Sequence, residues 1–342
     1  MGGTKIERPS SLNKNSDLFE VAPAKRTRVL LETGLVMAAF LILVPVLAIY
    51  RVTEFMIFCI FVLSFDLLYG YMGRLSFGQM LYLGTGVYVS TLFSLHVNPN
   101  PVLTMLAGVL GGAIVAGLLG LIIVRLADAS FALTNLAFNQ VGFFLIGSAF
   151  QEVTHGEDGI SSGVEPWGFL DFANEPVAFV FVLVCLLVTF YILKVLTNSP
   201  YGIIIRSIKE DESRVRFLGY STFYYKWLTF VIAGGVAALA GTLYTLYIQF
   251  VSPVSIHPLS NVEVIFACLI GGAGNLYGAL AGGVFFMTLK DNLATHIPEW
   301  EWILGILLLV IVFWLRRGLT GFATFLIGFL RQKIARGQPA EA

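Results

Sequence analysis

The chain has 342 residues, of which 57% are hydrophobic and only 12% are charged, and its formal net charge at pH 7 is zero. A soluble globular domain carries about twice that charged share, so the composition excludes an ordinary soluble protein. Apolar runs of about twenty residues recur along the sequence, and this pattern predicts an all-α polytopic membrane protein.

The first 28 residues are polar and mixed in charge. They contain too few apolar residues to fold alone, and they lack the short apolar core of a cleaved signal peptide. We expect residues 1–28 to form a mobile cytoplasmic tail.

The first half of the chain contains five apolar segments that short polar or glycine-rich breaks separate. They cover residues 29–50, 55–69, 75–95, 102–124 and 131–150. Each segment is predicted to be a membrane helix because its composition suits the hydrocarbon core of a bilayer. The next stretch, residues 151–176, is polar and contains no Lys or Arg, so it is predicted to be an extracytoplasmic loop.

The second half contains an interrupted apolar stretch. Three uninterrupted helices are predicted there, at residues 177–196, 227–251 and 302–315. Residues 261–289 are also apolar, but Gly271, Gly272 and Gly274 interrupt them. Broken helices persist in membranes only where protein or a water-filled cavity covers the backbone. We therefore predict a broken or re-entrant helix pair at this position.

Residues 198–226 form the only long charged stretch between apolar segments. Ser199 followed by Pro200 is typical of a helix start, and Gly219 is typical of a helix end. Apolar side chains recur at spacings of four, seven and three positions, about one or two helical turns, at Ile204, Ile208, Val215 and Leu218. The charged side chains around them are Arg206, Lys209, Glu210, Asp211, Glu212, Arg214 and Arg216. The pattern predicts a short amphipathic surface helix, with a solvated loop between two membrane helices as the alternative.

Positive charges cluster in the amino-terminal tail, in residues 198–226 and in the segment after residue 315. Cytoplasmic segments are enriched in Lys and Arg, so all three regions are predicted to be cytoplasmic. Because both termini then lie on one side, the number of crossings must be even. We predict eight full transmembrane helices plus the broken pair within residues 29–319, followed by a cytoplasmic tail over residues 320–342.

The sequence carries no catalytic signature, because a nucleophile elbow, a paired-histidine metal motif and a phosphate-binding loop are all missing. Cys59, Cys185 and Cys268 lie in apolar segments without metal-ligand spacing, and we predict that they are buried hydrophobes. We therefore expect no enzyme activity, no metal site and no cofactor bound by this chain.

Polar side chains inside the predicted membrane helices indicate a solute pathway, because such groups are costly in lipid. The candidates are Ser76, Gln79, Asn135, Asn139 and Gln140. Asn135 and Asn139 are four positions apart and share one helical face. Hydrogen bonding between helices is the alternative explanation for these amides.

Glycine pairs spaced four residues apart occur at Gly108 with Gly112 and at Gly278 with Gly282. Lipid gives helices no hydrophobic reason to associate, so close backbone approach through small residues holds them together. We predict that both pairs pack against other helices of the same chain.

Five short motifs, taken in order, resemble the integral-membrane permeases of the branched-chain amino acid / urea ABC transporter family. They lie at residues 75–88, 131–140, 154–159, 206–220 and 271–278, and the resemblance covers about residues 67–319. Gln79, Asn135 and His155 stand where the family pattern has His, Thr and Gly. Because these three positions lie near the expected pathway, leucine-like amino acids, other amides and urea all stay open as the solute.

The resemblance implies a permease subunit of an ATP-driven importer in a bacterial-type inner (plasma) membrane. It also implies a second, related permease subunit, two ATPase subunits that use the ATP, and an extracytoplasmic solute-binding protein. Residues 198–226 would be the coupling helix that docks on an ATPase, and residues 151–175 would face the binding protein. Membrane lipid would surround the chain, and no nucleic acid is involved.

The rival interpretation is a secondary transporter or channel that works alone. A broken helix also suits such a protein, because many carriers build their sites from discontinuous helices. A proton-coupled carrier, however, usually needs ionisable groups near the membrane midplane, and the sequence places its few membrane acids toward the helix ends.

Overall fold

The computed structural model describes residues 23–168, 170–296, 302–303, 305–306, 318–319 and 321. The tail predicted for residues 1–28 falls outside the described residues except for its last six, which begin the first helix. Most of the helix predicted at 302–315 and nearly all of the tail predicted at 320–342 also lie outside the described residues.

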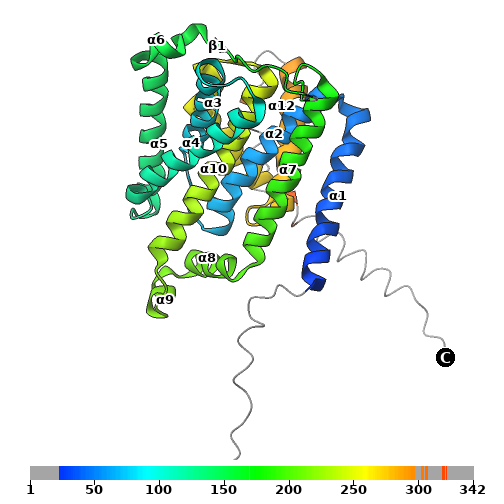
Figure 1. The fold of residues 1–342 in the computed structure, drawn as a ribbon. Helices are drawn as coiled ribbons and strands as arrows, with labels where there is room; N and C mark the ends of the chain where they lie inside the picture. The colour runs from blue at the N-terminus through cyan, green and yellow to red at the C-terminus, as the bar shows by residue number, and fades with distance from the viewer. Residues whose placement is uncertain are drawn as a thin grey trace, which may run out of the picture.

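The described chain is mainly helical (Figure 1). Its long helices are α1 (Pro23–Leu47), α2 (Ile49–Asp66), α3 (Gln79–His96), α4 (Pro101–Ile123), α5 (Asp128–Phe144), α7 (Glu175–Asn198), α10 (Thr222–Ile248) and α12 (Leu276–His296). Shorter helices are α6 (Gln151–Thr154), α8 (Pro200–Glu210), α9 (Glu212–Phe217) and α11 (Asn261–Gly271). Turns of π-helix, η1 (Leu67–Tyr71) and η2 (Leu145–Ala149), extend α2 and α5. The remaining elements are the 3-10 turns η3 (Gly156–Asp158), η4 (Pro253–Ile256) and η5 (Pro258–Ser260), and the antiparallel strands β1 (Ile160–Ser161) and β2 (Phe250–Val251).

Six helices in the described part of the chain are long and apolar enough to cross a membrane, namely α1, α2 with η1, α4, α5 with η2, α7 and α10. They make the chain a multi-pass membrane protein. Exposed leucines and isoleucines cover the outer faces of these helices, including Leu31 and Ile42 of α1 and Leu110 of α4. Such faces suit lipid and would be unfavourable in water. The total of eight crossings and the cytoplasmic position of the termini stay predictions.

The first break in the bundle lies at Ala48 and not at residues 51–54, where the sequence predicts it. Ala48 has a φ of 67°, which ends α1. The polar residues that follow instead form the first turn of α2, where Val52 and Thr53 are fully buried and the Thr53 hydroxyl donates to the Ile49 carbonyl (2.9 Å). Burial of two side chains in this turn therefore outweighs the polarity of Arg51, which stays at the surface end of the helix.

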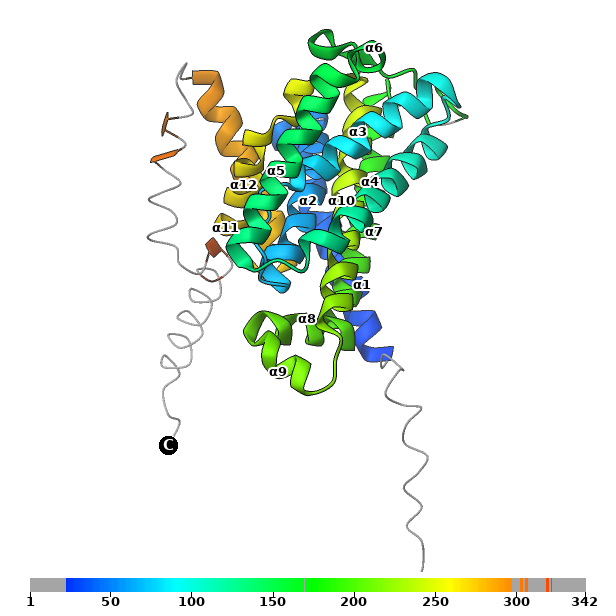
Figure 2. The same cartoon turned by 90° about the vertical axis from the view of Figure 1, so that its left-hand side faces the viewer.

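The centre of the bundle is α2 (Figure 2). In the most apolar 18 residues of α2 with η1, 83% of the residues are buried, whereas in the corresponding stretches of α1 and α4 only 17% and 28% are buried. It contacts α7, α10, α11 and α12. A helix that is apolar on nearly all sides is expected to be enclosed by other helices, and α2 follows this rule.

Small residues bring α10 against α3 and α4. A methyl group added at Gly86 of α3 would collide with the backbone of Ala238 in α10, and one added at Gly112 of α4 would collide with the Ala238 side chain. Gly108 of α4 faces Thr242 in the same way. Backbones approach so closely only where no side chain separates them. The predicted packing of Gly108 and Gly112 within the chain is therefore confirmed.

The helix break predicted for residues 261–289 is confirmed as a hairpin of α11 and α12. Gly272 and Gly274 have φ values of 102° and 86°, a region that favours glycine. Any side chain at Gly271 would collide with the Gly278 carbonyl, so the two helices leave the turn with their backbones in contact. With 11 residues, α11 rises only about 16 Å, roughly half the thickness of the hydrocarbon core.

Candidate functional site

The charged stretch at residues 198–226 forms two short helices, whereas the sequence predicts one. Pro200 is the first residue of α8, as predicted, but the Ser199 hydroxyl donates to the Leu196 carbonyl (2.6 Å) and does not cap the helix. Asp211 has extended backbone angles and separates α8 from α9. Its Oδ1 accepts from the Arg214 backbone N–H (3.0 Å), because an aspartate at this position satisfies a free donor of the next helix.

The break at Asp211 also changes the apolar stripe. Ile205, Ile208 and Val215 are buried against the bundle, whereas the predicted members Ile204 and Leu218 are half-buried and exposed. The predicted spacing assumes one continuous helix, and the turn between α8 and α9 shifts the face that the second helix buries. Gly219, with a φ of 90°, ends the pair as predicted.

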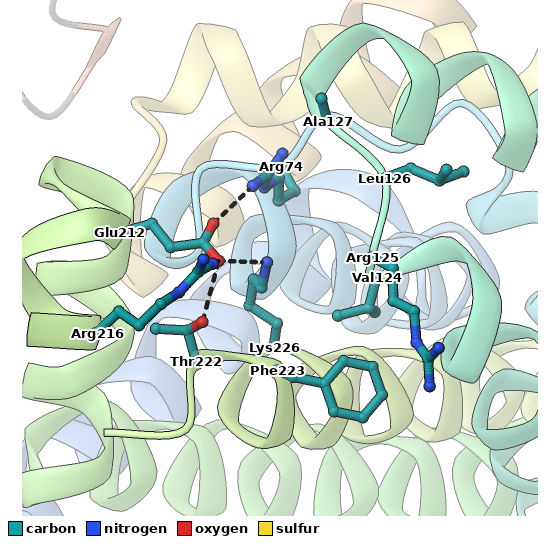
Figure 3. Close-up of a pocket in the computed structure, with 10 residues that line it drawn as sticks. All are labelled: Arg74, Val124, Arg125, Leu126, Ala127, Glu212, Arg216, Thr222, Phe223 and Lys226. Atoms are coloured by element: carbon teal, nitrogen blue, oxygen red, sulfur yellow. Dashed lines mark hydrogen bonds and ion pairs between the residues drawn. The ribbon is translucent and has the colours of Figure 1, made fainter. Parts of the chain in front are cut away.

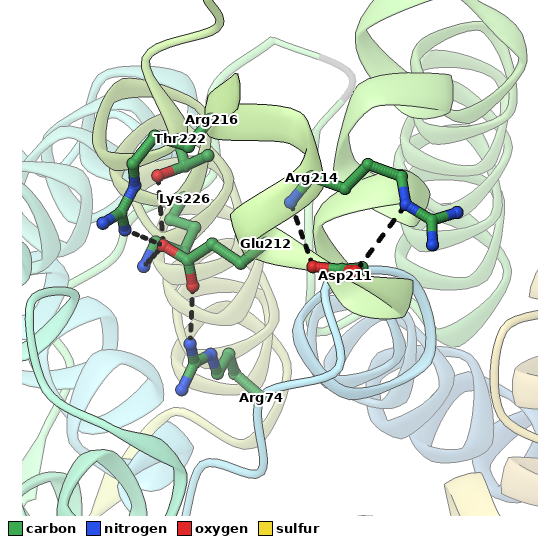
Figure 4. A network of polar contacts seen from close by, with 7 residues as sticks. All are labelled: Arg74, Asp211, Glu212, Arg214, Arg216, Thr222 and Lys226. Carbon is green, nitrogen blue, oxygen red and sulfur yellow. Dashed lines mark hydrogen bonds and ion pairs between the residues drawn. The ribbon is translucent and has the colours of Figure 1, made fainter. Parts of the chain in front are cut away.

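Glu212 is the centre of a polar network that joins three parts of the bundle (Figure 4). Its carboxylate accepts hydrogen bonds from Arg74 in the link between η1 and α3 (3.1 Å), from Arg216 of α9 (3.1 Å), and from Lys226 of α10 (2.7 Å). The Thr222 hydroxyl donates to the same carboxylate (3.0 Å). Among the charged partners of Glu212, Lys226 and Arg74 are the well-shielded ones, with side-chain exposures of 8% and 14%, and Thr222 is buried as well. The network fixes α9 against the start of α10.

A second contact connects α8 with the α11–α12 hairpin. The Lys209 ammonium donates to the Gly70 carbonyl (2.7 Å) in η1, where the carbonyl groups of a helix end lack helical partners. One turn earlier, Asp66 accepts a hydrogen bond at Oδ1 from the Gly274 backbone N–H (2.7 Å) in the hairpin turn. Cys268 of α11 donates to the same oxygen (3.5 Å). The end of α2 therefore lies between α8 and the hairpin turn and contacts both.

The remaining charged residues of α8 and α9 differ in where they point. The Arg206 guanidinium lies over the Tyr71 ring (4.9 Å), toward the bundle. Glu210 is exposed, and Arg214 is 81% exposed with only a local ion pair to Asp211 (3.7 Å). Arg206 and Lys209 therefore contact the membrane helices, whereas Glu210, Asp211 and Arg214 stay available to another molecule.

A cavity of about 390 Å³ lies beside the Glu212 network, between the α4–α5 link and the start of α10 (Figure 3). Its charged lining residues are Arg74, Arg125, Arg216, Lys226 and Glu212. Four cations against one carboxylate make this part of the surface positive, which favours an acidic partner surface.

The Glu212 network gives a prediction about acid. Partial burial opposes ionisation of Glu212, but hydrogen bonds from Lys226 and Thr222 and the charge of Arg74 lower its pKa below the ordinary value. A depressed carboxyl pKa stabilises the fold above the unfolded-state pKa, and this contribution is lost as pH falls through the folded-state pKa. We expect Glu212→Gln to lower the apparent melting temperature at pH 7, with the difference from wild type shrinking as the pH falls below the ordinary carboxyl range. Thermal unfolding of both proteins across this pH series measures the difference in melting temperature. A difference that stays constant with pH would contradict the lowered pKa of Glu212.

The predicted pathway residues are divided between two environments. Ser76, Gln79, Asn135 and Asn139 are buried, whereas Gln140 lies on the exposed face of α5. Position 140 follows Asn139 by one residue, which turns its side chain about 100° away from the buried face. The structure therefore does not bring Gln140 together with the other four.

The buried amides are only partly satisfied. Gln79 donates to the Ser64 hydroxyl (3.1 Å) and to the Ala233 carbonyl (3.4 Å), but its Oε1 has no partner within the described residues. Asn135 donates to the Phe131 carbonyl (2.9 Å) of its own helix. For Asn139 Nδ2, too, the described residues provide no hydrogen-bond partner. Hydrogen bonds between helices therefore account for part of this group of buried amides. Gln79 Oε1 and Asn139 Nδ2 are left without a partner in the described residues, and because both are buried, a solute or water can reach them only if the helices around them move apart.

The sequence matches a profile described as branched-chain amino acid transport system / permease component over residues 47–315. The high-affinity branched-chain amino acid transport system permease protein LivM of Salmonella typhimurium is 26% identical over 293 residues, which covers 78% of this chain and 68% of that protein. The LivM protein of Escherichia coli is 26% identical over 291 residues, covering 77% and 68%. A probable branched-chain amino acid transport permease protein LivH of Methanocaldococcus jannaschii is 25% identical over 230 residues, covering 65% and 71%. No solved structure shows a significant match to the chain.

Proposed function

Because the chain belongs to the family of branched-chain amino acid transport permeases, we propose that it carries branched-chain amino acids or a related small polar solute across the membrane. It is a permease component of an ABC importer. The names of the relatives support branched-chain amino acids as the first solutes to test, ahead of urea or simple amides.

The proposal includes the partners of the chain. Relatives named LivM and LivH both match this sequence, which supports a second and related permease subunit. Two ATPase subunits would supply the energy by using ATP, and an extracytoplasmic solute-binding protein would deliver the solute. The chain would sit in a bacterial-type inner membrane, with α8 and α9 on the cytoplasmic side.

The observation that carries the coupling role is the exposed apolar tip of α9. Phe217 is 91% exposed and Leu218 is 72% exposed, although Val215 of the same helix is buried. Large apolar side chains in a charged surface mark protein–protein contacts. The exposed charged residues Glu210, Arg214 and Arg216 belong to the same two helices, so an ATPase groove could bury the apolar tip while charge pairs fix its register.

Movement of α8 and α9 would reach the membrane through the end of α2. The Glu212 network fixes α9 to α10, and the Lys209–Gly70 and Asp66–Gly274 contacts join α8 to the α11–α12 hairpin. A displacement imposed on α9 by an ATPase would therefore move α10 and the hairpin together. Rigid shifts of this kind can exchange outward-open and inward-open arrangements.

We expect Phe217→Asp to remove most of the ATPase subunit from the purified complex. A charge in the centre of an apolar contact must be desolvated, and hot-spot positions commonly cost 2 kcal/mol or more, about 30-fold in affinity. Co-purification of the ATPase with the tagged chain, followed by solute uptake in reconstituted vesicles, measures both steps.

The control is Val97→Asp, which places the same charge on an exposed apolar residue at the opposite end of the bundle. It should retain the ATPase. Full ATPase recovery with Phe217→Asp would contradict the docking role of α9. ATP-independent uptake by the chain alone would instead support the rival carrier, for which the α11–α12 break is the supporting feature.

A further inference from the structure

A second cavity of about 390 Å³ lies at the end of the bundle opposite α8 and α9. Its walls belong to α2, α3, α10, α11, α12 and the 3-10 turns η4 and η5. Glu54 lines it near the start of α2 and Lys290 near the end of α12, whereas the other ends of these two helices meet close to Lys209. The half-length helix α11 begins at this cavity. Its volume is in the range of small-molecule pockets.

The polar part of the cavity contains an ion pair and a further acid. The Lys290 ammonium donates to both carboxylate oxygens of Glu263, each at 2.8 Å. The two side chains keep exposures of 29% and 28%, so the pair is not sealed from the cavity. Glu54 lines the same space from α2. Charged groups at membrane depth are costly and typically mark solute pathways.

One side of the cavity, formed by α2, α3 and α12, is apolar, whereas Tyr244, Tyr247 and Ser260 add hydroxyl groups to the rest of the lining. Ile57 and Phe61 of α2 are 6% and 2% exposed, and Met80 of α3 and Met287 of α12 complete this side. The Asn261 side chain accepts from the Met80 backbone N–H (2.8 Å), which fixes the start of α3 against the start of α11. A rigid apolar wall next to fixed charges suits a ligand with one apolar and one charged end.

We propose that this cavity is a binding site within the permease for an aliphatic α-amino acid in its zwitterionic form. Lys290 pairs with the carboxylate of the ligand, Glu54 and Glu263 pair with its ammonium group, and the apolar wall receives its branched side chain. The inference rests on the proposed function and deepens it, because it names the groups that recognise the solute. Urea and simple amides lack both the charges and the aliphatic side chain, so the site selects against them.

A purely structural role for the Lys290–Glu263 pair is the competing explanation. The chain offers a matched comparison, because Lys194 of α7 pairs with Glu32 of α1 (3.2 Å) with similarly shielded side chains, at 18% and 24% exposure. Neither of these two residues lines the cavity. A Lys→Gln substitution in either pair removes a shielded ion pair, but only the one at Lys290 also removes a charge from the cavity.

The first experiment labels the unmodified complex, so it does not depend on the folding of a variant. The full chain, assembled with its partner subunits in nanodiscs, is irradiated with a leucine analogue that carries a diazirine in its side chain, and the modified peptides are identified by mass spectrometry. We expect labels on α2 around Ile57 and Phe61 and on α12 around Met287, and we expect excess leucine to suppress them. Labels confined to other helices would overturn the site.

The second experiment tests the role of Lys290 with a ligand that lacks the carboxylate. Leucine should suppress wild-type labelling at least tenfold more effectively than 3-methylbutylamine, its carboxyl-free analogue. In Lys290→Gln this preference should disappear, whereas Lys194→Gln should retain it. Co-purification of the ATPase reports that both variants assemble.

The outcomes separate this inference from the proposed function. If the wild-type complex imports leucine but the Lys290→Gln variant keeps the full preference for leucine, the site is wrong and the proposed function stands. If the wild-type complex imports none of leucine, isoleucine and valine, the proposed function fails and the assigned ligand fails with it.

Discussion

Replacing Gly271 with valine is expected to abolish the folded α11–α12 hairpin and, with it, solute uptake. Any Cβ at this position would overlap the Gly278 carbonyl and would lie 3.1 Å from the Gly282 backbone nitrogen, one turn further along α12. These are backbone atoms, so no side-chain rotation relieves the overlap, and the two helices must separate. Overpacking against a fixed backbone belongs to the severe class of substitutions, which cost more than about 4 kcal/mol. Uptake by the reconstituted complex and the apparent melting temperature measure the effect.

The control for this variant is Gly34→Val in α1. Gly34 also lies in an apolar helix, but apart from its neighbouring residues and the nearby backbone of its own helix, no atom of the described chain lies within 4 Å of the position where its Cβ would be. It should keep wild-type uptake and melting temperature. A Gly271→Val protein that still imports solute at the wild-type rate would show that the hairpin can open without loss of function, against the contact geometry.

The hairpin itself could be predicted because a glycine indicates a turn by its own backbone freedom, without reference to distant residues. Gly271, Gly272, Gly274 and the following Asn275 interrupt an otherwise apolar stretch, and Gly272 and Gly274 use the backbone angles that glycine allows. The apolar segments could be predicted for a similar reason, since their length and composition reflect the bilayer and not a particular neighbour.

Positions that depend on a partner far away in the sequence could not be predicted. Glu212 is one of several charged residues in its stretch, and its importance comes from Arg74, which lies 138 residues away. The break between α8 and α9 depends on Asp211. From the sequence, an aspartate here is equally compatible with a surface position on one continuous helix and with an N-cap between two helices. Similarly, Ala48 ends α1 although nothing in its residue type favours a positive φ.

The residues of the solute pathway were only partly predictable, because residue type does not specify which way a side chain points. Asn135 and Asn139 share a face and are both buried, whereas Gln140 is exposed on the same helix. Whether a buried amide lines a pathway or holds two helices together depends on the remaining partners. Asn135 accepts from the Tyr82 hydroxyl of α3 (3.4 Å), a bond between helices, whereas within the described residues Asn139 Nδ2 has no partner.

Replacing Asp66 with leucine is expected to lower ATP-driven uptake at least tenfold while leaving the ATPase subunits bound. Asp66 is fully buried, and it is the acceptor for the Gly274 backbone N–H in the hairpin turn. Leucine leaves this donor unsatisfied, which costs about 1–3 kcal/mol and releases the turn from the end of α2. Phe217 and the Glu212 network lie elsewhere, so docking should be unaffected. Uptake, ATP hydrolysis and ATPase co-purification, measured on the same preparation, separate loss of coupling from loss of assembly.

Asp66→Asn is the matched control for this loss of coupling. The asparagine side chain has nearly the same size and keeps an oxygen that can accept from the Gly274 N–H, so uptake should stay within about threefold of wild type, since less than 0.7 kcal/mol is lost. If the carboxylate charge and not the acceptor were essential, both variants would lose uptake equally. Retained uptake in Asp66→Leu would instead mean that the hairpin turn moves independently of α2, and the route from α8 through Gly70 to the hairpin would then have to be abandoned.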